Sequence, residues 1–305
     1  MNSRLWGIDL GGTKIEGVVL ESLENPKPLV RLRVDAEAQK GYDSILLQIR
    51  KLVQMMEQES GQPPKKIGFG TPGVLDPMLM TMKNCNSTAL NGQPLQEDLE
   101  KLLGVPVALA NDANCFALAE TKWGIVKEKA PEAKVVFGII MGTGVGGGLV
   151  FHGALWNGKH GIGGEWGHNF LDESGGPCYC GKTGCVEKIL SGPSLEKYYT
   201  SITGNKLKLR EIIGRHESGN DEAAKKTVER LIHFFGKAIS VVTNILDPDV
   251  YVIGGGVGNI DLIYTEGARS LQQFIFNNRV DVQILKPSLG DSAGVFGAAA
   301  LVDNQ

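Results

Sequence analysis

The chain has 305 residues, 42% of them hydrophobic and 21% charged, and a formal net charge of −3 at pH 7. This composition is typical of a soluble globular protein, and the length is sufficient for two domains with buried cores. The slightly acidic balance argues against partners such as nucleic acid or an anionic membrane, which need a basic surface. No charged and then apolar leader opens the sequence, so we expect a cytoplasmic rather than a secreted protein.

The first half of the chain predicts alternating strands and helices. Residues 4–10 and 15–20 are apolar runs on either side of Gly-Gly-Thr-Lys, a pattern typical of a β-hairpin. Residues 41–60 have the apolar spacing of a helix that ends before a Gly-Gln-Pro-Pro segment. A strand running into a Gly/Pro loop, a short helix, a strand and a further helix are then expected at 66–77, 95–104, 105–112 and 113–124.

The second half repeats the beginning of the first. Residues 135–151 read as two buried strands around a glycine turn, because the run is shorter than the ~20 residues of a membrane span and is broken by glycines. Five of the fourteen positions in 7–20 recur in 138–151, which predicts two domains built on one plan. A long helix, a strand entering a glycine loop and a buried terminal helix are expected at 221–246, 250–259 and 290–302.

Two glycine patterns match nucleotide motifs by their letters alone. Gly142-x-Gly144-x-x-Gly147 fits the dinucleotide fingerprint, but that motif needs a helix to begin at the glycines, and the residues that follow read as a strand. Gly176 to Thr183 fits the phosphate-loop pattern, but polar, turn-like residues precede it and Pro177 lacks a backbone N–H. We therefore reject both interpretations.

The same segment supports a metal site better. Cys178, Cys180 and Cys185 supply three thiolates, and His168 can supply a fourth ligand. Three cysteines and one histidine are a common structural zinc arrangement, and four protein ligands leave no open position for a catalytic zinc. The alternative is three buried free cysteines without a metal. Clustered cysteines in so large a chain favour a reducing compartment over a disulfide framework.

A third glycine motif, "GIDLGGTK" at 7–14, is suited to binding phosphate. Its turn offers backbone N–H groups, Thr13 adds a hydroxyl, and Asp9 at the strand end can hold Mg²⁺ through water. Taken alone, the motif is equally compatible with a simple turn. Together with "MGTGVGGG" and "VIGGGVGN", it favours a nucleotide held between two domains.

The motifs "GIDLGGTKIEG", "GTPG", "NDANCFALAE", "GTGVGGG", "GGEWGH", "CYCGKTGC-E" and "VIGGG" occur in this order. From about residue 5 to 302 the chain thereby resembles the ROK-family sugar kinases. The resemblance implies the actin/hexokinase-like (ribonuclease H-like) α/β fold, duplicated into two domains around a central cleft. It implies a small N-terminal domain of residues 1–117 completed by 288–305, and a large domain of 118–287 that carries the zinc loop.

The resemblance also assigns roles to individual residues. Asp112 is implied to be the catalytic base. The sugar is implied to contact Gly73, Asn111, Glu165, His168 and Glu187, with His168 binding zinc through its other ring nitrogen. The first phosphate turn comprises Asp9, Gly11, Gly12, Thr13 and Lys14; the second comprises Gly142, Thr143 and Gly144; and Gly254, Gly255 and Gly256 lie on the adenosine side. The position of Asp112 after a strand and before a helix agrees with its role, although helix capping alone would also explain it.

The expected function is therefore ATP-dependent phosphorylation of a hexose hydroxyl, the 6-OH of fructose, mannose or glucose, with Mg²⁺ and a structural zinc. The motifs look most like the fructokinase/mannokinase branch, and an N-acetylglucosamine kinase is the close alternative. The resemblance further implies a homodimer. A sugar-responsive regulator needs a DNA-binding module before residue 4, for which we expect no room. A catalytically silent sugar-binding protein is disfavoured because Asp9 and Asp112 are intact.

Overall fold

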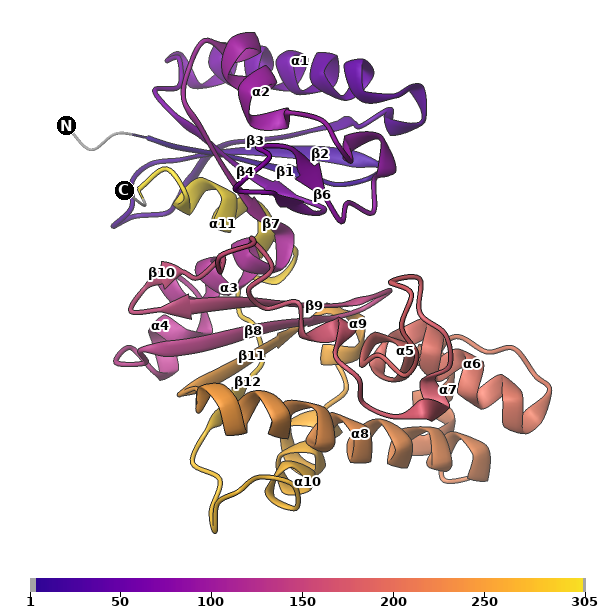
Figure 1. The fold of residues 1–305 in the computed structure, drawn as a ribbon. Helices are drawn as coiled ribbons and strands as arrows, with labels where there is room; N and C mark the ends of the chain where they lie inside the picture. Colours follow the sequence, from indigo (N-terminus) through magenta and orange to yellow (C-terminus); the bar gives the residue numbers. More distant parts are fainter. Residues whose placement is uncertain (1–3, 304–305) are drawn as a thin grey trace. The chain divides into compact units, whose positions relative to one another are not determined.

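The structure is a computed structural model that describes residues 4–303, and these form two compact units (Figure 1). The first unit comprises the chain up to Lys129, Gly148–Gly163 and the chain from Ser288 onward. The second comprises Ala130–Gly147 and Gly164–Pro287. The domain boundaries that the resemblance implies, after residues 117 and 287, stay a prediction.

The first unit is built on a five-stranded sheet with the order β3-β2-β1-β4-β7. Its strands are β1 (Leu5–Leu10), β2 (Lys14–Leu20), β3 (Pro28–Asp35), β4 (Ile67–Thr71) and β7 (Val107–Asn111). The pairs β1–β2 and β2–β3 are antiparallel, whereas β1–β4 and β4–β7 are parallel. The predicted opening hairpin is confirmed. A separate antiparallel ribbon joins β5 (Val74–Leu75) to β6 (Met82–Lys83).

Helices cover both faces of this sheet. Helices α1 (Tyr42–Ser60) and α2 (Leu95–Leu103) lie on one face, and α3 (Asp112–Lys122) and α11 (Ala293–Ala300) lie on the other (Figure 1). The apolar residues that α1 buries are Ile45, Ile49, Leu52, Val53 and Met56, which recur at helical spacing. The helix α4 (Ile125–Lys129) follows α3.

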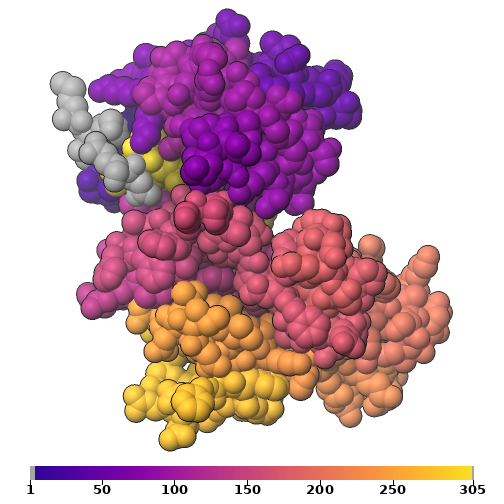
Figure 2. All heavy atoms as spheres, viewed as in Figure 1, coloured from indigo at the N-terminus to yellow at the C-terminus, as the bar shows by residue number. Residues whose placement is uncertain are grey.

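Helix α11 packs backbone to backbone against the sheet, and glycine makes this approach possible. A Cβ on Gly7 of β1 would lie 2.4 Å from the backbone nitrogen of Ala299, and one on Gly68 of β4 would lie 1.8 Å from the carbonyl oxygen of Ala298. A side chain at either strand position would therefore push the terminal helix away. Figure 2 shows the terminal segment, in yellow, among the atoms of the first unit.

The second sheet repeats the order of the first. Its order is β10-β9-β8-β11-β12, so in both sheets the strands stand in the order third, second, first, fourth and fifth. The bounds are β8 (Val135–Met141), β9 (Val145–Phe151), β10 (Ala154–Leu155), β11 (Val250–Gly254) and β12 (Gln283–Leu285). Strand β11 runs parallel to both β8 and β12. The expectation of two domains built on one plan thus agrees with the strand order.

The long predicted helix is α8 (Glu222–Leu246), which packs beside β11, where the hydroxyls of Thr243 and Tyr251 are 2.9 Å apart. The other helices of the second unit are α5 (Glu187–Leu190), α6 (Gly192–Thr203), α7 (Leu209–Glu217), α9 (Gly255–Gly258) and α10 (Ala268–Gln272). Single helical turns occur at Ala38–Lys40, Thr88–Leu90, Trp166–His168, Glu173–Gly175, Ile263–Gly267 and Gly290–Ser292. Within residues 4–303, no helix has the length and apolarity to cross a membrane.

Candidate functional site

Two carboxylates stand at strand ends in the first sheet. Asp9 is the fifth residue of β1, and Asp112 follows β7 and begins α3. The Oδ1 atom of Asn111 caps α3 by accepting a hydrogen bond from the N–H of Ala113 at 2.9 Å, and Oδ1 of Asp112 accepts from the same N–H at 2.7 Å. A helix start favours an anion, so the local fold stabilises the ionised form of Asp112.

The surrounding protein acts in the opposite direction on both carboxyl groups. Burial, and next the charge of Asp112, raise the pKa of Asp9 to about 6. The pKa of Asp112 is also raised by the density of protein around it, even though the residue keeps an exposed edge, and the hydrogen bond from Ala113 opposes this shift. Binding of a proton or a cation therefore stabilises each carboxyl group, and shifted pKa values of this kind are common among active-site residues.

The first glycine turn joins β1 to β2. Gly12, Thr13 and Lys14 are exposed there, so the turn can present backbone N–H groups and the Thr13 hydroxyl to a ligand. The room beside Asp9 depends on two other glycines. A Cβ on Gly70 would lie 3.3 Å from Oδ1 of Asp9, and one on Gly294 would lie 3.2 Å from Oδ2.

Gly73 is fixed in the loop that follows β4. A Cβ at this position would lie 2.4 Å from Sγ of Cys85 and 2.7 Å from the carbonyl oxygen of Lys83. The buried hydroxyl of Thr71 donates a hydrogen bond to the Gly73 carbonyl at 2.9 Å, and Nδ2 of Asn111 donates to the Thr71 carbonyl at 3.4 Å. The "GTPG" loop and the end of β7 are thus connected within the first unit.

The other two glycine motifs meet in the second unit. Gly142 and Gly144 form the turn between β8 and β9, where the N–H of Gly142 donates to the carbonyl of Gly144 at 2.9 Å. Because a strand and not a helix follows this turn, rejection of the dinucleotide fingerprint is confirmed. Gly255, with φ +82°, begins α9 after β11, and a Cβ on it would lie 2.4 Å from the carbonyl oxygen of Met141. A Cβ on Gly142 would lie 3.9 Å from the nitrogen of Gly256.

Glu187 contacts the second glycine turn directly. Its Oε2 atom accepts a hydrogen bond from the N–H of Val145 at 3.1 Å. A Cβ on Gly144 would lie 2.7 Å from the same oxygen, so only glycine leaves space for this carboxylate. The residue implied to bind sugar therefore also holds the turn implied to bind phosphate. The sequence contained no signal for this contact.

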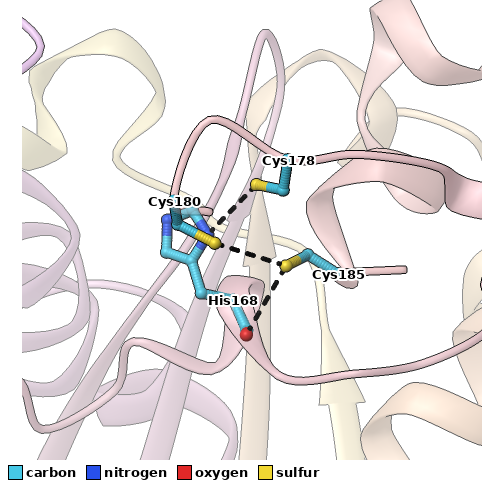
Figure 3. Close-up of side chains that lie close together, drawn as sticks. All are labelled: His168, Cys178, Cys180 and Cys185. Carbon is cyan, nitrogen blue, oxygen red and sulfur yellow. Dashed lines mark hydrogen bonds between the residues drawn. The ribbon is translucent and has the colours of Figure 1, made fainter. Parts of the chain in front are cut away.

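Four predicted metal ligands come together in the second unit (Figure 3). The ligand atoms of His168, Cys178, Cys180 and Cys185 all lie within 4.8 Å of one another. Sγ of Cys178 is 3.7 Å from Nδ1 of His168, and the Sγ atoms of Cys180 and Cys185 are 3.6 Å apart. Ligands of a tetrahedral zinc at ~2.0–2.3 Å stand roughly 3.3–3.8 Å from one another, a range that contains both of these separations, and three thiolates with one imidazole are donors that suit this ion.

The backbone of the cysteine loop forms its own tight turn. The N–H of Cys178 donates to the carbonyl of Lys182 at 2.8 Å, and the N–H of Gly184 donates to Gly176 at 2.9 Å. These two N–H groups therefore donate to carbonyl groups of the loop itself and do not point at a phosphate site. This agrees with our rejection of the phosphate-loop match. The backbone N–H of Lys182 lowers the pKa of Cys180, whereas burial raises that of Cys185 to about 12.

The second ring nitrogen of His168 has a partner that sequence reasoning missed. The hydroxyl oxygen of Tyr179 is 3.1 Å from Nε2 of His168, and the two rings meet edge to face with centroids 5.2 Å apart. Glu165 immediately precedes the turn that carries His168. The only available signal for Tyr179 was its position between Cys178 and Cys180, which brings it to His168 once the cluster closes.

Comparison with known proteins identifies the family. The model of the ROK family matches residues 5–305. An N-acetyl-D-glucosamine kinase of Vibrio vulnificus is 36% identical over 307 residues, with 97% of this chain and 98% of the relative covered. The ROK hexokinase of Thermus thermophilus superposes with a TM-score of 0.87 at 29% identity, covering 99% of this chain and 100% of that one. The chain therefore belongs to the ROK family.

A solved ROK glucokinase of Streptomyces griseus, in complex with glucose and AMPPNP, has a TM-score of 0.79 at 25% identity and covers 99% of this chain and 100% of its own. These relatives confirm the predicted hexokinase-like α/β fold and the prediction of a ROK-type sugar kinase. They support the N-acetylglucosamine kinase alternative better than the fructokinase/mannokinase branch. The fructokinase-like specificity that the motifs favoured gains no support from them.

Proposed function

We propose that the protein is an ATP-dependent N-acetylglucosamine kinase that phosphorylates the 6-hydroxyl of the sugar. The observation that carries the proposal is the similarity over nearly the whole chain to kinases named for this substrate. The candidate acid–base group, Asp112, and all three glycine motifs also support the proposal. A protein that binds the sugar without phosphorylating it would not need these groups.

Asp112 is the proposed base. Phosphoryl transfer needs an aligned hydroxyl, a group that accepts its proton, and stabilisation of charge on the phosphates. Asp112 is anchored at the start of α3, and its raised pKa makes its carboxylate a stronger base than an ordinary aspartate. We propose that Asn111, Gly73, Glu165, His168 and Glu187 contact the sugar.

The glycine turns are the proposed phosphate and nucleotide contacts. In the first unit these are Gly11, Gly12, Thr13 and Lys14, and in the second Gly142, Thr143, Gly144, Gly254, Gly255 and Gly256. Mg²⁺, when bound, neutralises charge on the phosphates. The crowded carboxylate of Asp9, with its pKa near 6, is the group in the first unit that we propose faces this ion.

The Cys/His cluster is the proposed structural zinc site. Its ligands are His168, Cys178, Cys180 and Cys185, whose spacing fits a tetrahedral ion. The zinc fixes the loop from His168 to Glu187, so that the sugar contacts are held in place before the sugar arrives. Small displacements matter in this setting, because an error of about 1 Å in the attacking group can lower the rate ~100-fold.

A panel of hexoses with ATP and Mg²⁺ tests the proposal. Rates of ADP release are measured with N-acetylglucosamine, N-acetylmannosamine, glucose, mannose and fructose, and the phosphorylated product is identified by NMR. We expect the highest kcat/KM with N-acetylglucosamine. A clear preference for fructose or mannose would contradict the proposal and would favour the fructokinase/mannokinase branch. The homodimer implied by the family stays a prediction, which light scattering in solution tests.

A further inference from the structure

We infer that Tyr264 is a positioning residue for nucleotide binding: its hydroxyl fixes both ends of the glycine segment 254–258. The inference rests on the proposed function, in which this segment contacts ATP, and adds a residue that acts through the segment. The observation behind it is a single hydroxyl that lies 2.6 Å from the carbonyl oxygen of Gly258 and 3.0 Å from that of Ile253.

The glycine segment has few side chains of its own to fix it. Four of its five residues are glycine, and a glycine backbone can adopt many conformations. The exception, Val257, is buried and anchors the middle of the segment. Near its start, Gly255 packs against β8, since a Cβ there would lie 2.4 Å from the carbonyl oxygen of Met141. The end of the short helix α9 needs a further contact to keep one position.

The hydroxyl of Tyr264 makes that contact and joins it to the sheet. Ile253 belongs to β11 and directly precedes the segment, whereas Gly258 is the last residue of α9. The two ends lie close together, because a Cβ on Gly258 would be 2.7 Å from the carbonyl oxygen of Ile253. Both partners of the hydroxyl are carbonyl oxygens, so the phenol donates its proton and the two carbonyls share it. The end of the strand and the end of the helix are thereby connected.

Tyr264 is itself well anchored. It lies in the π-helical segment Ile263–Gly267, a type of turn that is frequent at functional sites. A Cβ on Gly267 would lie 2.8 Å from Cδ1 of Phe235, so this segment packs closely on α8. The ammonium group of Lys286 is 5.4 Å from the centre of the Tyr264 ring. Burial raises the pKa of Tyr264, so the hydroxyl keeps the proton that it donates.

Loss of this hydroxyl should therefore affect the nucleotide and not the sugar. A contact surface that is fixed before the ligand arrives costs little conformational entropy on binding. Without the bonds to Gly258 and Ile253, the glycine segment can adopt other conformations, and the nucleotide must select one of them. The cost should be seen in nucleotide affinity, whereas turnover at saturating ATP should stay the same.

The test compares Tyr264→Phe with the matched variant Tyr251→Phe. Tyr251 also belongs to the second unit, but its hydroxyl lies 2.9 Å from that of Thr243 and 3.4 Å from the carbonyl oxygen of Ile239, both on α8. ADP binding is measured by calorimetry without sugar, kcat and both KM values by steady-state kinetics, and stability by the midpoint of urea denaturation.

We expect Tyr264→Phe to weaken ADP binding and to raise KM for ATP about three- to tenfold, with kcat and KM for the sugar unchanged. Tyr251→Phe loses a comparable hydrogen bond, so it should lower the urea midpoint as well, yet bind ADP as the wild type does.

Unchanged ADP affinity in Tyr264→Phe would overturn the inference. An equal loss of ADP affinity in both variants would also overturn it, because the loss would then reflect general destabilisation. A wild-type protein that binds no ADP would contradict the proposed function and the inference together. A wild type that binds ADP but prefers another hexose contradicts only the proposed sugar, because the ADP titrations contain no sugar and still decide the role of Tyr264.

Discussion

The two sheets share one strand order but differ in what stands at the ends of their strands. In the first sheet, β1 carries Asp9 near its end and β7 leads into Asp112. In the second sheet the position that corresponds to Asp9 is Ile140 of β8, and the turn after it is Gly142 to Gly144. The first sheet thus has ionisable side chains at these positions, whereas the second has a glycine turn that exposes backbone groups.

This difference shows that one strand order can carry different chemical groups at the same positions. Carboxyl ends of neighbouring parallel strands bring their following residues to one edge of a sheet, whatever those residues are. In the first unit this edge holds two carboxylates with raised pKa values. In the second, glycines leave space for the carboxylate of Glu187 against the N–H of Val145. The strand order determines where these residues lie, and the identity of each residue determines which chemical group is present there.

The sharpest way to break the comparison is to remove the proposed base. Asp112→Asn keeps the size of the side chain and cannot accept a proton from the sugar. We expect kcat to fall by about 10²–10⁴-fold, while the sugar dissociation constant changes little. Stopped assays of ADP release and calorimetry measure the two quantities. Asp43→Asn, in the first turn of α1, is the control. A variant with wild-type turnover would exclude Asp112 as the base.

The second change removes a proposed metal ligand. Cys180→Ala should abolish stoichiometric zinc, because three ligands no longer close the tetrahedron. Sugar binding should weaken by about tenfold or more, since His168 and Glu187 lose their support. Zinc is measured by elemental analysis and sugar binding by calorimetry. Cys85→Ala removes a buried cysteine of the first unit and should leave zinc unchanged. Equal zinc in both variants would refute the proposed site.

The third change tests the carboxylate of the first sheet through stability. The folded protein raises the pKa of Asp9 from 3.8 to about 6, so it binds this proton more tightly than the unfolded chain does. The contribution of Asp9 to stability therefore falls as pH rises from about 4 to about 6 and stays low above that range. Asp9→Asn should raise the free energy of unfolding at pH 7 by at most about 3 kcal/mol, with no gain at pH 4.

Urea denaturation in EDTA without nucleotide measures this effect, and the same variant should lose kinase activity. If Asp9→Asn raises the free energy of unfolding equally at pH 4 and pH 7, the charge of the Asp9 carboxylate is not the cause of the increase.

The smallest expected effect concerns the glycine turn of the second sheet. A Cβ in Gly144→Ala would lie 2.7 Å from Oε2 of Glu187 and must displace that side chain from the Val145 N–H. Because the obstacle is the end of a flexible side chain, we expect KM for ATP to rise about three- to tenfold while the protein stays folded. Gly214→Ala on α7 meets nothing within 4 Å and should stabilise the protein by about 1 kcal/mol without a change in KM. An unchanged KM in Gly144→Ala would show that this contact does not shape the nucleotide site.

The sequence alone determined the elements whose pattern is local. The opening hairpin, α1 and α8 were predicted because the apolar periodicity of one segment suffices to recognise them. The motif order identified the family, and the cysteine spacing with His168 identified the four residues that cluster. Strand β3 was missed although charged and apolar residues alternate along it, as is typical of a half-buried strand. Helix α5 was missed because only its first residue, Glu187, belongs to a motif, and α6, α7 and α10 were missed because they lie in segments without a motif.

Only the tertiary structure decided which groups touch. That Glu187 reaches the N–H of Val145, 42 residues earlier in the chain, depends on how two turns of the second unit pack. The pairing of Tyr179 with Nε2 of His168 depends on a loop that folds back on itself. The raised pKa of Asp9 arises from burial, which no single strand produces. Periodicity records which face of an element is buried, whereas contacts between loops are set by the three-dimensional path of the backbone, and a motif does not contain that path.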